Sequence, residues 1–186
     1  MFLRDATAPI AAVAKEAGVG ISALYHRYSG KDELLRRLCA DVLAEFVSIG
    51  QDSLARAGDP WQDFTAFVTG IVDSDVHALT VNLAGTFTPD PELGALARQA
   101  SELSTRIFDR AMGAGALRPD LRVEDLGLLF EQLTAVQAAD PERTRELRHR
   151  YLAIQFDGLR AGGASGELPG PAPRPAEFAG RWKSRT

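Results

Sequence analysis

Residues 9–35, PIAAVAKEAGVGISALYHRYSGKDELL, form the stretch that decides the fold of this chain. Apolar residues recur at helical spacing on two short segments within it, and Gly18 lies between those segments. Glycine enters the left-handed conformation that ends a helix with little strain. A second helix is predicted over residues 21–28. The stretch therefore indicates a helix-turn-helix, a unit that places its second helix in the major groove of DNA.

The first of these helices has one apolar face. Pro9 is well placed for the first helical position, where its missing N–H group would cost nothing. Ile10, Val13, Ala14 and Ala17 follow with the i, i+3, i+4, i+7 spacing of a buried helical face.

The second helix is the candidate for DNA recognition. Leu24 and Tyr28 are four residues apart and should face the protein interior. The remaining side chains then turn toward solvent or DNA, namely Ile21, Ser22, Ala23, Tyr25 and His26. Polar groups among them can bond base edges or phosphate oxygens, and the small apolar ones can contact a thymine methyl group. Two alternatives stay open: Tyr25 packs on a neighbouring helix, and Ser22 and His26 are surface residues without a role.

Four short motifs in this stretch carry a family resemblance: Val13-Ala14, Ala17-Gly18-Val19, Leu24-Tyr25 and Ser29-x-Lys31-x-x-Leu34-Leu35. Together they resemble the DNA-binding segment of the TetR (tetracycline-repressor-like) family of transcriptional regulators. The resemblance implies an all-α protein with a DNA-binding head and a helical body that binds a small-molecule effector. It also implies that residues from Gly20 onward and Tyr25 meet bases and phosphates of double-stranded DNA, and that Lys31 contacts a phosphate.

The chain departs from the family at its beginning. TetR-like heads start with another helix that packs on the helix-turn-helix, whereas residues 1–8 hold at most the end of such a helix. Either the true start lies upstream of Met1, or the chain is a real truncation with an impaired head. We favour the first interpretation, because an isolated pair of short helices buries too little surface to be stable.

One long helix is predicted after the turn, over residues 31–55. Ser29 and Asp32 have the spacing of a capping box at its start. The helix joins a head of residues 1–45 to a body of residues 46–161. Residues 1–40 hold six Lys and Arg side chains against four acidic ones, whereas the whole chain has a net charge of -4. This distribution suits a regulator that presents one end to phosphates, and it equally suits an ordinary acidic helical protein.

Five further apolar segments predict the body. The first begins near residue 61. The other four cover about 79–87, 92–113, 123–138 and 141–161, and Pro and Gly residues mark the breaks between segments. The last two segments carry apolar residues on more than one face, which agrees with burial on both sides. The resemblance implies that this pair meets its copy in a second subunit as a four-helix bundle. We therefore expect a homodimer that binds a palindromic operator.

The effector should bind between the body helices, since apolar clefts between packed helices are the usual pockets. Asn82 is the most informative candidate, because a polar side chain in an apolar stretch needs a partner. Each candidate is also a plausible plain core residue. The candidates are Trp61, Phe64, Phe67, Ile71, Asn82, Leu83, Phe87, Leu103, Ile107 and Phe108.

Signals for catalysis, metals and cofactors are weak. A metal site is suggested by three possible ligands, Asp73, Asp75 and His77. Only Asp73 and His77 share a helical face. Cys39 is the only cysteine, which excludes intrachain disulfides, and a small buried filler is its expected role. No phosphate-binding loop or paired nucleophile is present. We expect no enzyme, no cofactor and no metal.

The tail from residue 162 is rich in Gly and Pro and is expected to be disordered. Phe178 and Trp182 within it could dock on another surface. No apolar run is long enough for a membrane span, and no signal peptide is evident, so a cytoplasmic protein is expected.

The sequence thus predicts a ligand-responsive, homodimeric DNA-binding regulator, most often a repressor among proteins of this kind. The alternative is a dimeric ligand-binding or interaction protein that has lost DNA binding through truncation of its head.

Overall fold

The computed structural model describes residues 8–163 and 165–179. The described residues form helices and no strands, which confirms the all-α prediction. The helices are α1 (Ile10–Glu16), α2 (Ile21–Arg27), α3 (Lys31–Ala55), α4 (Pro60–Asp73), α5 (Val76–Leu83), α6 (Pro91–Gly113), α7 (Asp125–Ala135), α8 (Pro141–Leu159), the 3-10 turn η1 (Ala161–Gly163) and α9 (Pro175–Ala179). The remnant of an earlier helix that the sequence suggested at residues 1–7, and Trp182, lie outside the described residues.

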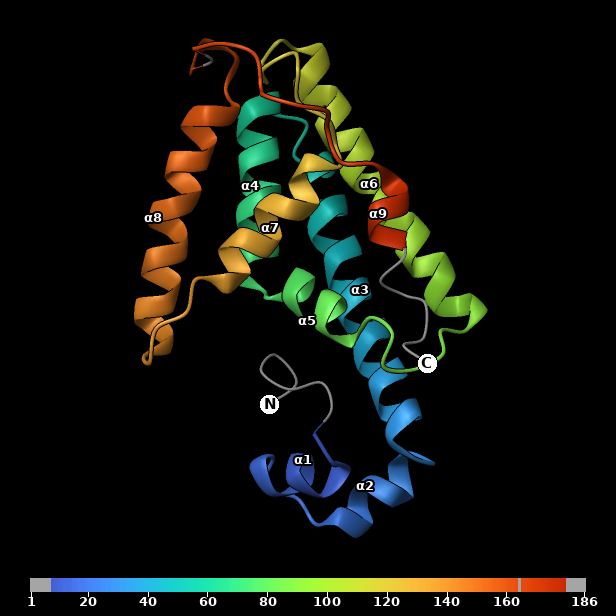
Figure 1. Ribbon diagram of the computed structural model, residues 1–186. Coiled ribbons are helices and arrows are strands. Elements are labelled where there is room, and N and C mark those ends of the chain that lie inside the picture. The colour runs from blue at the N-terminus through green and yellow to red at the C-terminus, as the bar shows by residue number, and fades with distance from the viewer. Residues whose placement is uncertain (1–7, 164, 180–186) are drawn as a thin grey trace.

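The helices are arranged as a small head at one end of a larger body (Figure 1). Helices α1 and α2 make the head, and α3 leaves it and runs into the body between the other helices. The boundary we placed between residues 45 and 46 falls inside α3, which is continuous from Lys31 to Ala55.

Three Asp-Pro pairs fix the starts of body helices. Asp59, Asp90 and Asp140 each occupy the N-cap position, with proline next in the chain. Each carboxylate accepts a hydrogen bond from a backbone N–H group in the first turn of its helix. An acidic cap satisfies a free N–H group and also suits the positive end of the helix dipole. These local signals explain why α4, α6 and α8 begin within a residue of their predicted starts.

Two local expectations were wrong. The segment predicted at 79–87 is helical at Val76–Leu83 instead, because Asp75 adopts a left-handed conformation (φ 55°) that starts a new helix directly after α4. The capping box of Ser29 and Asp32 does not form. Gly30 is the N-cap of α3, and the carboxylate of Glu33 accepts a hydrogen bond from the Ser29 N–H group. Hydrogen bonds from the Ser29 side chain, and then from its backbone N–H group, lower the pKa of Glu33.

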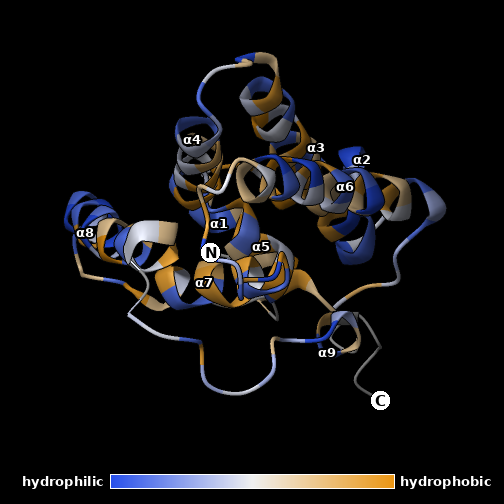
Figure 2. Ribbon diagram, turned by 90° about the horizontal axis from the view of Figure 1, so that it is seen from above, coloured by the Kyte–Doolittle hydropathy of each residue, from blue (hydrophilic) through white to orange (hydrophobic). Residues whose placement is uncertain are grey.

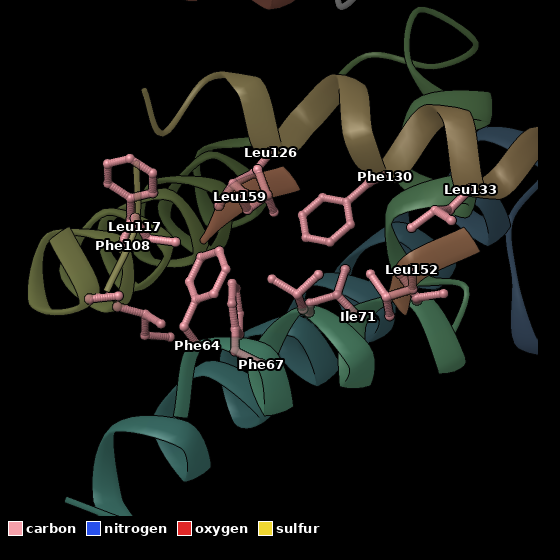
Figure 3. Close-up of a cluster of buried hydrophobic side chains, with 14 of the residues drawn as sticks. Phe64, Phe67, Ile71, Phe108, Leu117, Leu126, Phe130, Leu133, Leu152 and Leu159 are labelled. Atoms are coloured by element: carbon pink, nitrogen blue, oxygen red, sulfur yellow. The ribbon is translucent and has the colours of Figure 1, made fainter. Parts of the chain in front are cut away.

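The main core lies between α4, α7 and α8. Phe64, Phe67 and Ile71 of α4 are at most 1 % exposed and point toward the apolar side chains of α7 and α8 (Figure 3). Phe130 and Leu152 are among the facing residues. A second cluster packs α3 against α5 and α6 around Leu35, Cys39, Leu83 and Leu103. Together the clusters hold α3 to α8 as one body.

The segment after α8 runs along one side of the body, near the end distant from the head, and reaches α9 (Figures 1 and 2). We expected disorder from residue 162. Within this segment the structure places η1 and the short helix α9. Phe178 of α9 lies against Gly127 of α7.

Candidate DNA-binding head and effector cavity

The turn of the head is a glycine-ended helix terminus. Gly18 has φ +67°, the left-handed region in which glycine is favoured. Its N–H group donates to the Lys15 carbonyl (3.3 Å), and the N–H group of Val19 donates to the Ala14 carbonyl (3.0 Å). This pair of bonds is the Schellman motif that closes a helix C-terminus. It stops α1 and lets α2 begin at Ile21.

One face of α2 is open to solvent. Gly20 precedes it in an extended conformation, and the side chains of Ile21, Ser22, Ala23, Tyr25 and His26 are all exposed. Tyr25 is 53 % exposed and Ile21 is 40 % exposed, so both present apolar surface to water. Leu24 and Tyr28 are half-buried. The structure thus brings the predicted contact residues of α2 together on one accessible face.

Basic side chains flank this face. Lys31 stands at the first position of α3 and is half-buried. Arg27 is exposed at the end of α2, and its guanidinium lies 5.6 Å from the centre of the Tyr28 ring. The sequence reasoning did not single out Arg27. Its position at the last turn of the recognition helix was the available signal.

The body touches α3 close to the head through Arg36. Its Nε donates to the Thr88 carbonyl (3.4 Å) and lies 3.8 Å from the carboxylate of Asp90, the N-cap of α6. The α5–α6 connection is therefore linked to α3 one turn beyond Lys31.

A cavity of about 370 Å³ lies between α3, α5, α6 and α7. That size suits a small organic molecule. Its lining residues are Phe46, His77, Ser101, Ser104, Thr105, Val123, Glu124, Leu126, Gly127, Phe130, Pro175 and Phe178.

The cavity joins apolar walls to a few polar groups. The Phe46 and Phe130 rings supply apolar surface, and the His77 ring lies 5.1 Å from the Phe130 ring. Nε2 of His77 is 4.0 Å from the Glu131 carboxylate. The Ser104 hydroxyl donates to the Ala100 carbonyl of its own helix (2.9 Å), so its oxygen stays able to accept a hydrogen bond. The arrangement fits a largely apolar ligand with a polar group.

The ten effector candidates from the sequence lie elsewhere. Phe64, Phe67, Ile71, Leu83, Phe87, Leu103, Ile107 and Phe108 are buried core residues, and none of the ten lines this cavity. Trp61 lies in a shallow groove between α4 and α8, and Asn82 is exposed. The sequence signal for this cavity is on α6, where Ser101, Ser104 and Thr105 are polar residues at i, i+3, i+4 spacing beside an apolar face.

The suspected metal residues have other neighbours. Asp73 Oδ1 lies 2.6 Å from His149 Nε2, and Asp75 accepts a hydrogen bond from the buried Arg148. Among the described residues, no group of three or more His, Cys, Asp or Glu side chains has the geometry to hold a metal ion.

The body also has an uncovered apolar surface. Tyr151 and Ile154 of α8 are 49 % and 58 % exposed, and Leu128 of α7 is 37 % exposed. Tyr151 and Ile154 are three residues apart and lie on one side of α8.

In the part of the chain that the structure describes, no helix is long and apolar enough to cross a bilayer.

Two family models match the chain. Residues 6–38 match the model for bacterial regulatory proteins of the tetR family, and residues 59–161 match the C-terminal domain of SbtR-like transcriptional regulators. The second match alone covers more than half of the chain. A comparison with curated proteins finds no match.

Solved structures share the fold. The ketosteroid transcriptional regulator KstR2 of Mycobacterium tuberculosis superposes with a TM-score of 0.61 at 19% identity, over 85% of this chain and 86% of that chain. The TetR family regulator PfmR from Thermus thermophilus superposes with a TM-score of 0.58 at 19% identity, over 86% of this chain and 98% of that chain. The TetR regulator SCO0520 from Streptomyces coelicolor superposes with a TM-score of 0.57 at 22% identity, over 80% of this chain and 85% of that chain.

Proposed function

This chain belongs to the TetR family of bacterial transcriptional regulators, and on that premise we propose that it is a homodimer that binds a palindromic operator and responds to a small-molecule effector. In this proposal residues 1–45 bind DNA, residues 46–161 bind the effector and dimerise, and residues 162–186 form a tail. The single observation that carries the DNA-binding role is the exposed face of α2 beside the Gly18 turn.

The recognition residues we propose are Ile21, Ser22, Ala23, Tyr25 and His26, with the backbone of Gly20 and the side chain of Lys31. The α2 side chains are exposed together, which suits insertion into the major groove. Lys31 lies at the N-terminus of α3, where free N–H groups of a long helix also favour a phosphate. No Arg or Asn stands at the start of α2, so DNA shape contributes to specificity.

Dimerisation through α7 and α8 is the second part of the proposal. The exposed Leu128, Tyr151 and Ile154 supply apolar surface that a second copy can cover. A two-fold dimer places two recognition helices about one DNA turn apart, which requires a palindromic operator.

The effector site we propose is the cavity between α3, α5, α6 and α7. Its ligand is a small molecule with an apolar body and a group that bonds His77 or Ser104. Binding there shifts α6 relative to α3, and the contact of Arg36 with Thr88 and Asp90 transmits the shift toward the head.

Fluorescence anisotropy over a salt series tests the DNA-binding proposal. The probe is a labelled duplex from the region upstream of the protein's own gene, with a scrambled duplex as reference. Lys31→Ala should lower affinity and reduce the slope of log affinity against log salt by about 1. Arg106→Ala removes the same charge from an exposed position on α6 and is the matched control. An equal effect of both variants, or equal affinity for both duplexes, contradicts the proposed interface.

A further inference from the structure

The segment after α8 is tied to the body by a buried arginine. Arg118 is 8 % exposed and donates to the Asp120 carboxylate through Nε (2.6 Å) and Nη2 (2.9 Å). Nη2 also donates to the Gly166 carbonyl (2.6 Å), and the Leu168 N–H group donates to Asp120 (2.6 Å). Residues 166–168 are therefore held by side chains from the loop between α6 and α7.

The same segment then reaches the wall of the cavity. Pro175 and Phe178 belong to its lining, although both lie more than forty residues beyond the other lining residues in sequence. Helix α9 is capped locally, because the Arg174 N–H group donates to the Glu177 carboxylate (2.7 Å). This cap fixes the turn that presents Phe178.

Phe178 lies close to the backbone of α7 at Gly127. A Cβ atom at position 127 would lie 3.0 Å from Cε1 of Phe178 and 3.4 Å from its Cζ. The missing side chain at Gly127 thus lets the ring approach the backbone of α7. The ring is half-buried in a segment that is otherwise largely exposed.

Residues 165–179 can separate from the body at a low free-energy cost. Gly and Pro are frequent in residues 165–179, and the hydrophobic clusters of the described residues contain none of this segment. Segments with few buried apolar contacts open locally at much lower free energy than the core. The core helices can therefore stay folded while α9 lifts.

We propose that residues 165–179 form an intramolecular lid in which Phe178 covers part of the effector cavity and slows the entry and exit of a ligand. The inference deepens the effector role proposed above for this cavity and rests on it. The Arg118–Asp120 pair is the fixed end of the lid, and α9 is its moving end.

Accessibility of a thiol inside the cavity tests the lid without DNA or effector. The reporter is Ser104→Cys in the full chain, labelled with a small chromogenic disulfide reagent at pH 8. The native Cys39 is fully buried, and burial raises its pKa to about 11, so it supplies little thiolate at this pH. The labelling rate of residue 104 therefore reports opening of the cavity.

Phe178→Ala in the reporter chain should raise the labelling rate about tenfold, the factor by which loss of one half-buried aromatic side chain shifts a local opening equilibrium. Phe178→Asp should do the same, because a carboxylate is disfavoured against the apolar rim. Leu168→Ala is the matched control, since it removes an exposed apolar side chain (42 % exposed) from the same segment without touching the cavity.

Unchanged labelling in both Phe178 variants overturns the lid. An equal rise in the Leu168 variant overturns it as well, because general loosening would then explain the effect. Thermal unfolding of each variant verifies that the body stays folded. Failure here leaves operator binding untouched, and failure of the anisotropy test leaves this result standing.

Discussion

The guanidinium of Arg110 on α6 lies 2.9 Å from the carboxylate of Asp63 on α4, whose side chain is 7 % exposed. The same arginine donates to the Gly58 carbonyl (2.7 Å), and the Gly58 N–H group donates to Asp63 (3.1 Å). The Ser53 hydroxyl donates to the Asp63 carbonyl from α3 (2.7 Å). Asp63 therefore joins α3, α4 and α6 at the end of the body distant from the head.

Arg110→Met should destabilise the body, because it leaves the buried Asp63 carboxylate without its cation. With a discount for the partly exposed arginine, we expect a loss of about 2 kcal/mol and a fall in Tm of about 4–8 °C. Urea and thermal unfolding followed by circular dichroism measure both. Arg143→Met is the control, since Arg143 and Glu146 form an exposed pair on α8, and it should cost less than about 0.5 kcal/mol. Equal losses in the two variants would contradict the role of Asp63.

Gly18→Ala should loosen the head without loosening the body. The left-handed conformation at Gly18 costs a residue with a Cβ atom about 1 kcal/mol. Amides of residues 10–20 should then exchange about fivefold faster in hydrogen–deuterium exchange mass spectrometry. Gly113→Ala serves as the comparison, because Gly113 ends α6 with nothing within 4 Å of an added Cβ atom. Slower or unchanged exchange in the Gly18 variant would show that the turn tolerates a side chain.

Ile154→Glu should separate the proposed dimer into monomers. It puts a charge beside the exposed Tyr151 on the same side of α8, and an unpaired charge is costly to bury. Light scattering coupled to gel filtration at micromolar concentration would show half the mass of the unaltered protein. Ala153→Glu adds the same charge to an exposed position on another side of α8 and should leave the mass unchanged. A monomeric parent protein would refute the dimer itself.

The bonds that Asp120 accepts from Arg118 and from the Leu168 N–H group predict a loss of folding stability at acidic pH only. The hydrogen bond from Arg118, and then that from the Leu168 N–H group, hold the pKa of Asp120 well below its usual range. The folded state therefore binds this proton more weakly than the unfolded chain, whose aspartate pKa is about 3.9. The stabilisation is complete above about pH 4 and falls as the pH drops below that value.

Asp120→Asn isolates this contribution. The difference in free energy of unfolding between the parent chain and the variant should stay constant from pH 8 to pH 5 and shrink below about pH 4. Urea unfolding at a series of pH values measures it. A difference that already shrinks between pH 7 and pH 5 would mean that the stabilisation does not depend on ionisation of the Asp120 carboxylate.

The sequence by itself determined the helix-turn-helix, the long helix Lys31–Ala55 and the starts of α4, α6 and α8. These features depend on short-range chemistry. Gly18 can adopt positive φ, and an aspartate followed by proline caps a helix wherever it occurs. The exposed face of α2 followed in the same way from the inward spacing of Leu24 and Tyr28.

Only the tertiary structure decided where the cavity lies and which residues line it. Apolar periodicity shows that Phe64 or Ile107 faces inward, but it does not distinguish a close-packed neighbour from an open space. The cavity is assembled from α3, α5, α6, α7 and α9, so its lining depends on how distant segments pack. The position of the tail also depends on long-range packing. Its composition predicts no core of its own, and its order comes from Arg118, Asp120 and Gly127, which long-range folding brings beside it.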